Sequence, residues 1–271
     1  MDERAALLLL SDAVGTLFGT EDFCLFLYSL VRMQMPKIIV ELGTGLGLSA
    51  FSMALAAKRN EAGHVWTVDN MDCFATYRAI VTEICGRLHQ SGLISTDHPS
   101  AGLYFEEITS LLGLEQHLTF VKSQMLLNEA GHFDHYPFAG KPIDLLFSDF
   151  QHDPKAILKI LGHFLPKMSL SCSIFIDSAS TYWPSYLLLE QLCSQWNQGK
   201  VPKALQDLCS EDLSDLVRSR RMLVVHLTER KQRAQNSTAW LKIEPIDVLP
   251  HPATIMRGAQ REKGANGSNG S

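Results

Sequence analysis

Two groups of polar residues have types and spacing that suit chemistry on a bound small molecule. The first is the stretch Glu41-Leu42-Gly43-Thr44-Gly45-Leu46-Gly47, which is followed by Ser49. Glycines let a backbone approach a ligand closely and adopt conformations closed to other residues. A helix that begins after such a turn points free N–H groups at a carboxylate or phosphate. The stretch therefore predicts a binding site for a ligand that carries one of these groups.

The second group is Ser148-Asp149-Phe150-Gln151-His152. A histidine titrates near physiological pH, and its neutral ring can take a proton from a reacting hydroxyl. His152 is therefore a candidate general base, with Asp149 beside it. The alternative is a surface histidine next to a helix that begins near Pro154, and the sequence leaves both interpretations open.

Both groups follow short apolar runs that predict buried strands. Residues 37–42 are rich in β-branched side chains, and residues 48–59 have the composition of a strong helix. The same reasoning predicts further strands over 64–69, 118–122, 143–149 and 172–177, with two late strands over 222–227 and 239–243. Helices are predicted between them, including 156–164 and 186–196.

Strands that alternate with helices predict an α/β fold with a doubly wound, mostly parallel seven-stranded sheet and helices on both faces. The two late strands lie close in sequence and suit an antiparallel hairpin at one edge. We expect an N-terminal helical segment over 1–35, a main domain over 36–257 and a disordered tail over 258–271, with an insertion over 70–117. Ligands of such sheets bind at the carboxyl ends of the strands, where both polar groups fall.

The glycine spacing distinguishes between cofactors. A dinucleotide-binding GxGxxG pattern would need a third glycine at position 48, which is Leu48. The observed GxGxG, with an acidic residue two positions before it, resembles motif I of the class I S-adenosylmethionine-dependent methyltransferases, and especially the catechol O-methyltransferase-like branch. That resemblance implies a Rossmann-like fold and S-adenosylmethionine as cofactor. It implies that the methionine half is lined by Glu41, Gly43, Gly45 and Gly47, with Ser49 on its carboxylate.

Two further cofactor contacts are expected after the second and third strands. Asp69 ends the second strand, and its carboxylate can accept hydrogen bonds from both ribose hydroxyls, the role that the resemblance also implies. The alternative is a helix cap or a solvated turn residue. Ser123 and Gln124 follow the third strand, where the family often contacts adenine, although a polar turn pair is common anywhere.

The resemblance also bears on the chemical end of the site. In the catechol and related families the loop after the fourth strand carries an aspartate and, three residues later, a lysine that acts as base. Here Asp149 matches the aspartate, and His152 stands at the lysine position. Metal-dependent members add an aspartate and an asparagine after the fifth strand. Asp177 matches, but Ser178 replaces the asparagine, so Mg²⁺ held by Asp149 and Asp177 is an expectation that lacks one ligand.

These residues predict an S-adenosylmethionine-dependent methyltransferase that methylates an oxygen of a small molecule. The loop after the fourth strand lacks the Asn/Asp-Pro-Pro-aromatic motif of enzymes that methylate adenine amino groups or amide nitrogens. The alternatives are a protein or peptide methyltransferase, an NAD-dependent oxidoreductase, and a non-catalytic binding protein that keeps the fold. Tyr182, Trp183 and Tyr186 could stack on a planar acceptor, but core packing is the favoured interpretation.

Composition and net charge limit the expected partners and the expected cellular compartment. The net charge of −5 disfavours nucleic acid as a partner, because phosphate binding needs a positive surface. No stretch approaches the ~20 apolar residues that cross a bilayer, so we expect no membrane contact. Six scattered cysteines without a CxxC pair suit free thiols in a reducing compartment, which predicts a cytoplasmic protein. The oligomeric state stays open, with a homodimer among the alternatives.

Overall fold

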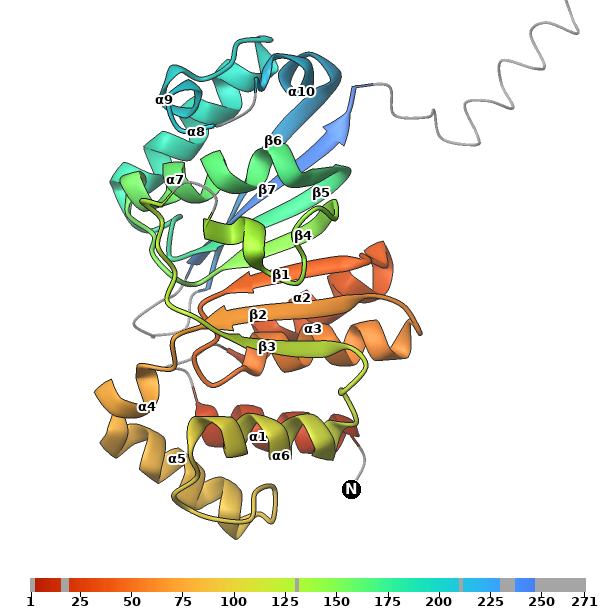
Figure 1. Ribbon diagram of the computed structural model, residues 1–271, viewed down its shortest axis with the longest axis vertical. Coiled ribbons are helices and arrows are strands. Elements are labelled where there is room, and N and C mark those ends of the chain that lie inside the picture. Colours follow the sequence, from red (N-terminus) through yellow and green to blue (C-terminus); the bar gives the residue numbers. More distant parts are fainter. Residues whose placement is uncertain (1–2, 16–19, 130–131, 210–211, 230–236, 247–271) are drawn as a thin grey trace, which may run out of the picture.

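A single seven-stranded sheet forms the centre of the molecule (Figure 1). The computed structural model describes residues 3–15, 20–129, 132–209, 212–229 and 237–246. The strand order is β3-β2-β1-β4-β5-β7-β6. The strands are β1 (Ile38–Leu42), β2 (His64–Asp69), β3 (Leu118–Lys122), β4 (Ile143–Ser148), β5 (Met168–Asp177), β6 (Arg220–Thr228) and β7 (Ser237–Pro245).

The pairing confirms the predicted fold class. Strands β1 to β5 are parallel, and β7 runs antiparallel to both β5 and β6. The last three strands are longer than the sequence predicts. The first residues of β5 alternate polar and apolar, because its amino end is partly exposed and lies outside the buried run that marks the rest of the strand.

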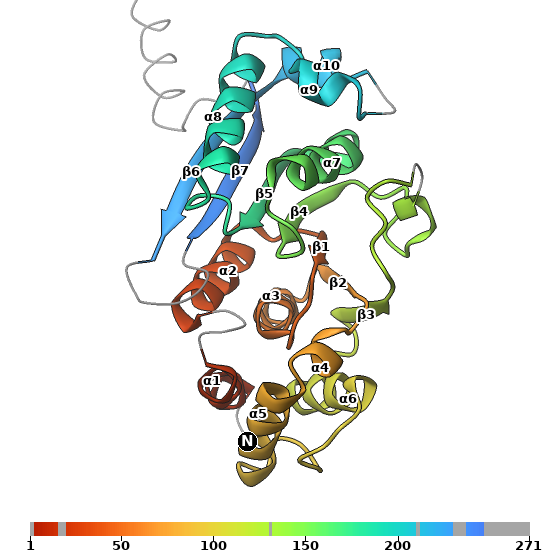
Figure 2. The ribbon, with the colours of Figure 1, turned by 90° about the vertical axis from the view of Figure 1, so that its left-hand side faces the viewer.

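Helices cover both faces of the sheet, as Figure 2 shows. On one face α2 (Glu21–Gln34) and α3 (Leu48–Arg59) pack on the strands, with α1 (Glu3–Val14) beyond them. On the other face lie α7 (Pro154–Phe164) and α8 (Trp183–Asn197), with α9 (Lys203–Gln206) and α10 (Ser214–Ser219) beside them. Two short 3-10 helices, η1 (His132–His135) and η2 (Leu165–Lys167), complete the elements on that face.

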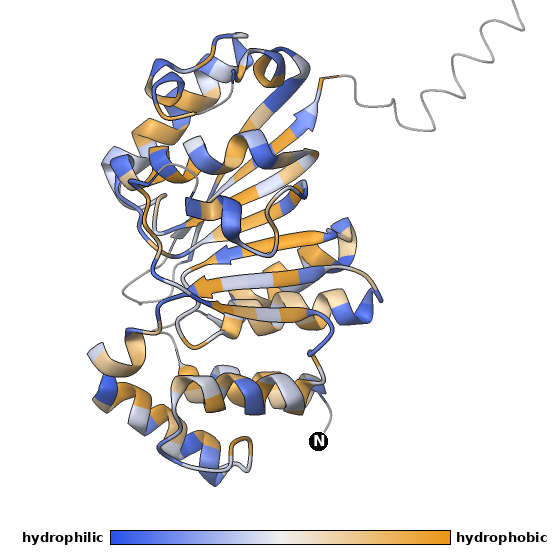
Figure 3. Ribbon diagram, viewed as in Figure 1, coloured by the Kyte–Doolittle hydropathy of each residue, from blue (hydrophilic) through white to orange (hydrophobic). Residues whose placement is uncertain are grey.

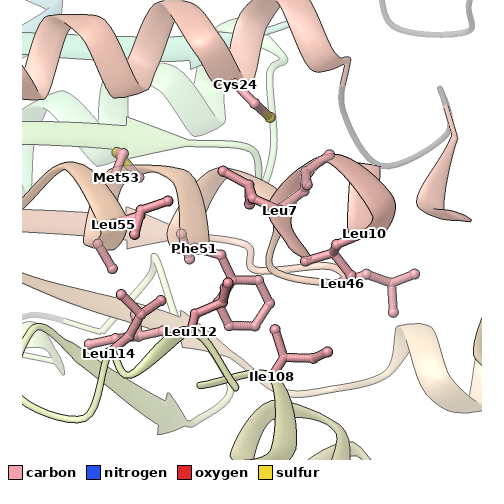
Figure 4. Close-up of a cluster of buried hydrophobic side chains, with 14 of the residues drawn as sticks. Leu7, Leu10, Cys24, Leu46, Phe51, Met53, Leu55, Ile108, Leu112 and Leu114 are labelled. Atoms are coloured by element: carbon pink, nitrogen blue, oxygen red, sulfur yellow. The ribbon is translucent and has the colours of Figure 1, made fainter. Parts of the chain in front are cut away.

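The predicted insertion between β2 and β3 forms three helices, α4 (Cys73–Thr76), α5 (Arg78–Gln90) and α6 (Ala101–Leu112). They share one apolar core with α1 and α3, in which Leu10, Leu46, Phe51, Ile108 and Leu112 are buried (Figure 4). Colouring by hydropathy shows why the sheet is enclosed, since its central strands are largely apolar (Figure 3). The insertion is therefore an integral part of the domain core.

The N-terminal helical segment consists of two helices. The hydroxyl of Thr20 accepts a hydrogen bond from the N–H of Phe23 at 3.2 Å and so begins α2. Met35, which precedes Pro36, ends that helix in a left-handed conformation, with φ of 50°. Among the described helices, none has the length and apolar character that crossing a membrane requires. The predicted tail over 258–271 lies outside the described residues.

Candidate functional site

The parallel strands bring most of the predicted site residues to one edge of the sheet. Leu42 pairs with Val68 on one side and with Ser148 on the other, so the turns that follow β1, β2 and β4 lie next to one another. The register continues to β3 and β5. Residues that follow five strands therefore meet at this carboxyl edge.

The loop between β1 and α3 takes a shape that only glycine accepts easily. Gly43, Gly45 and Gly47 all have φ between 54° and 88°, in the left-handed region. A Cβ atom on Gly43 would lie 2.5 Å from the backbone oxygen of Asp149. A Cβ atom on Gly47 would lie 2.7 Å from the ring of Phe105. The glycines are thus required both by backbone conformation and by close packing.

Glu41 organises this loop from inside the protein. It is fully buried, and its carboxylate accepts hydrogen bonds from the hydroxyl of Ser49 at 2.5 Å and from that of Thr67. The Thr67 hydroxyl lies 2.5 Å from that of Thr44. Burial is the main cause that raises the pKa of Glu41 to about 7, while the two hydroxyls oppose the rise. Glu41 therefore joins β1, β2 and the start of α3.

Asp69 braces the same loop. Its Oδ2 accepts hydrogen bonds from the N–H groups of Thr44 at 2.7 Å and Gly45 at 3.2 Å. Its Oδ1 accepts one from the N–H of Met71 at 2.6 Å. The sequence did not predict this contact between Asp69 and the loop. An ionised carboxylate has about four acceptor positions, so one position is left over, and ribose binding stays a prediction.

The insertion also holds the loop. The hydroxyl of Tyr104, which is completely buried on α6, donates to the backbone oxygen of Leu46 at 3.0 Å. The thiol of Cys73 on α4 lies 3.4 Å from the backbone oxygen of Gly45. Sequence reasoning missed both residues. An apolar helix face that contains a tyrosine gives no sign of which distant carbonyl its hydroxyl meets.

The turn after β3 lies beside this loop. The N–H of Ser123 donates to the backbone oxygen of Asp69 at 2.9 Å, which ties the two turns together. The hydroxyl of Tyr136 donates to that of Ser123 at 2.9 Å and also contacts the Nε2 of His132 at 2.8 Å. Gln124 is exposed. Ser123 and Gln124 therefore stand at the same edge as the glycine loop, and their contact with adenine stays a prediction.

A pocket of about 550 Å³ opens where β4 and β5 end. We call it the His152 pocket. It is lined by Phe150, Gln151, His152, Asp153, Ser178, Thr181 and Tyr182. Its walls thus come from the two loops that sequence analysis assigned to the chemical end of the site.

His152 is fixed from both sides. The next residue, Asp153, caps α7, since its Oδ1 accepts hydrogen bonds from the N–H groups of Lys155 at 3.0 Å and Ala156 at 3.3 Å. Pro154 stands in the first turn, where its missing N–H costs nothing. On the other side the hydroxyl of Ser185 donates to the backbone oxygen of His152 at 2.5 Å. A helix start and a second helix therefore determine where this histidine lies.

The opposite wall is strained and partly aromatic. Ser178 has φ of 58°, a conformation that is costly for a residue with a Cβ atom, and such strain gathers at functional sites. Tyr182 is 47% exposed and Trp183 is 64% exposed. The interpretation of these aromatics as core packing is therefore wrong for both. They lie just after β5, where the chain passes from the sheet to the surface, and apolar type alone does not show this.

The two predicted magnesium ligands lie in different surroundings. Asp177 is buried, and its two carboxylate oxygens accept hydrogen bonds from the hydroxyls of Ser178 at 2.9 Å and Thr238 at 3.0 Å. Asp149 is half-buried, and the described residues that line the His152 pocket include neither aspartate. No group of three or more histidines, cysteines or acidic residues is placed to hold a metal ion in the described ranges. The hydroxyls of Ser178 and Thr238 use two of the acceptor positions of Asp177, and Mg²⁺ at Asp149 and Asp177 stays a prediction.

The mostly parallel α/β sheet, the glycine loop after β1 and the acidic residue at the end of β2 are the features of a Rossmann-like fold that binds a ligand at its carboxyl edge. Residues 40–179 match the model of a methyltransferase domain family. This match covers more than half of the chain, so the chain belongs to that family, as the sequence predicted.

The chain is similar to several solved structures, of which the first below supports the fold. Cofactor-bound Rv0187 from MTB is 14% identical, with 90% of this chain and 91% of that one covered and a TM-score of 0.50. The O-methyltransferase TomG from Streptomyces achromogenes, in complex with SAM, is 14% identical over 88% and 89% of the two chains, with a TM-score of 0.47. An O-methyltransferase from Bacillus cereus in complex with SAH is 12% identical over 89% and 90%, with a TM-score of 0.49. No curated protein matches the chain.

Proposed function

We propose that this chain is an S-adenosylmethionine-dependent methyltransferase that methylates an oxygen of a small molecule. The observation that carries the proposal is the approach of the His152 pocket to the glycine loop that Glu41 and Asp69 hold in shape, since a Cβ atom on Gly43 would lie 3.1 Å from the backbone nitrogen of Phe150 in the pocket lining. Membership in the methyltransferase domain family supports the reaction class. The names of the similar solved structures support transfer to oxygen.

The cofactor, His152 and the pocket walls have separate roles in the proposed reaction. S-adenosylmethionine supplies, when bound, a methyl group on a positively charged sulfur, so the donor is already activated. The glycine loop with Glu41, Ser49 and Asp69 would hold the cofactor, and methyl transfer would require the acceptor hydroxyl to lose its proton. The neutral ring of His152 takes this proton at a ring nitrogen. The pocket walls align the acceptor and exclude water, which supplies much of the rate enhancement.

The setting follows from the same features. We propose a cytoplasmic protein, because the described cysteines include no disulfide pair. A small-molecule acceptor is supported by the volume of the His152 pocket, which lies within the range of drug-sized ligand sites. The net charge of −5 supports a protein that does not bind nucleic acid.

The test has two stages. Calorimetry with S-adenosylhomocysteine measures whether the cofactor site exists, and we expect saturable binding. Transfer of a labelled methyl group from S-adenosylmethionine is then followed for a panel of hydroxylated aromatic and aliphatic acids. Absence of cofactor binding would overturn the proposal. Binding without turnover of any acceptor would favour the non-catalytic alternative.

A further inference from the structure

One wall of the His152 pocket is held by the hairpin of β6 and β7. The N–H of Ser178 donates to the backbone oxygen of Ser237 at 2.6 Å. The N–H of Thr181 donates to the hydroxyl of Ser237 at 3.0 Å, and the two hydroxyls lie 2.8 Å apart. Ser237 is buried at the start of β7. The segment 178–182 therefore depends on residues more than fifty positions later in the chain.

A second attachment of this wall comes from β6. The Nδ1 of His226 lies 2.7 Å from the hydroxyl of Ser180, and its Nε2 lies 3.2 Å from a carboxylate oxygen of Glu190 on α8. The two ring nitrogens thus contact different elements, the pocket wall and the helix. The His226 side chain is 17% exposed and that of Glu190 is 47% exposed, so the contact with Ser180 is the more shielded of the two.

The ring of His226 is also part of an aromatic stack. It lies 4.0 Å from the ring of Tyr186, with 25° between the planes, and Tyr186 lies 5.2 Å from Trp183 at 12°. Tyr186 follows Ser185, whose hydroxyl holds the backbone of His152. One histidine therefore touches the wall on one side and, on the other, the helix turn that places the catalytic candidate.

We propose that His226 is a positioning residue that sets the acceptor-facing wall of the His152 pocket through its Nδ1 contact with Ser180. This rests on the proposed function in that the pocket is taken to hold the acceptor. His226 does not touch the reacting atoms. It keeps segment 178–182 in the strained conformation that closes the pocket, while its contact with Glu190 secures only α8 to the sheet.

Two substitutions separate the two contacts. The side-chain amide of asparagine can occupy the position of Nδ1, and that of glutamine can reach the position of Nε2. His226→Asn therefore keeps a partner for Ser180 and loses Glu190, whereas His226→Gln keeps Glu190 and loses Ser180. Both lose the ring that stacks on Tyr186, so stacking is matched. Asparagine is the poorer strand residue, so general damage to β6 would harm His226→Asn more.

The measurement is amide hydrogen exchange by mass spectrometry on the full chain. We expect segment 178–187 to exchange about tenfold faster in His226→Gln, because local opening becomes easier, and to stay close to wild type in His226→Asn. Ser180→Ala should behave like His226→Gln. Peptides from β7 and from the glycine loop should be unchanged in all three variants.

Equal exchange in His226→Gln and His226→Asn would overturn the inference, as would faster exchange in His226→Asn or loss of protection throughout β6 and β7. S-adenosylhomocysteine affinity is measured on the same samples. A wild-type protein that does not bind this ligand would overturn the proposed function, while the exchange comparison would still decide whether His226 fixes the wall.

Discussion

The carboxyl edge of the sheet contains two halves that are built differently. In the half formed by β1, β2 and β3, groups on these strands and on the insertion hold the glycine loop, such as Glu41 with Ser49 and Asp69 with Gly45. In the half formed by β4 and β5, the walls are held by groups far away in the chain, such as Ser237. The proposed cofactor half is therefore held by the first strands and the insertion, and the proposed acceptor half is held in part by the edge hairpin. The difference teaches that a change in the hairpin should act on the wall of the His152 pocket before it acts on the glycine loop.

The largest expected effect is a loss of turnover that leaves cofactor affinity unchanged. His152→Ala removes the proton acceptor but touches nothing in the glycine loop, so kcat for the acceptor should fall about 10²- to 10⁴-fold. S-adenosylhomocysteine affinity by calorimetry should stay unchanged. The exposed His98, which lies in the insertion, gives the matched control His98→Ala. Unchanged turnover in His152→Ala and in Asp149→Ala would disprove the assignment of the catalytic loop.

The next largest effect is expected when a glycine of the proposed cofactor half gains a side chain. Gly43→Ala places a methyl group against the backbone of Asp149 at a positive φ. The conformational cost is about 1–2 kcal/mol and the overpacking cost about 1–3 kcal/mol, so cofactor affinity should fall about 100-fold in calorimetry. Gly92 has φ of 70° with no atom near its added Cβ, so Gly92→Ala is the control for conformation alone. Equal affinity in both variants would mean that close packing at Gly43 does not matter.

A third prediction uses the raised pKa of Glu41. Because burial raises this pKa from 4.5 to about 7, the folded state binds more protons than the unfolded state between these values. The stability of the wild type therefore falls as pH rises through this window, and Glu41→Gln should lack this loss. Urea unfolding should show the variant gaining about 3 kcal/mol relative to wild type between pH 4.5 and pH 7.5.

The control for this titration is Glu115→Gln, since Glu115 is exposed on the surface of the insertion. Its stability should follow the wild-type curve at every pH. A Glu41→Gln curve that also runs parallel to wild type would show that folding does not raise the pKa of Glu41.

The smallest expected effect concerns Asp69. Asp69→Asn keeps an oxygen for the loop N–H groups but loses the negative charge and part of the acceptor capacity. We expect cofactor affinity to fall about tenfold, as for loss of one charged hydrogen bond. Asp72→Asn, at an exposed neighbouring position, should have no effect. A normal affinity for Asp69→Asn would show that the carboxylate serves only the loop.

Much of the fold and part of the site could be predicted from the sequence. The apolar run of β1, the helix 48–59 and the strand 64–69 are encoded by adjacent residues, and their bounds are nearly those of the structure. The turn residues after the parallel strands follow from topology, since carboxyl ends must meet at one edge. This explains why the positions of Glu41, Asp69 and His152 at this edge can be predicted from the sequence.

The rest depends on contacts between distant positions. Tyr104 meets the carbonyl of Leu46 across 58 residues, and His226 meets Ser180 across 46. No local pattern carries such information, because a tyrosine on an apolar helix face or a histidine in a strand has many suitable partners. The exposure of Trp183 was misjudged for the same reason, since burial depends on what packs above a side chain.

The position of β7 has a consequence for how the chain is made. Among the described strands it is the last in sequence, yet it lies between β5 and β6 in the sheet. In the described part of the chain β6 pairs only with β7, so a nascent chain that ends before Ser237 has no strand with which β6 can pair. The wall formed by segment 178–182, which Ser237 holds, can likewise be completed only after β7 has left the ribosome.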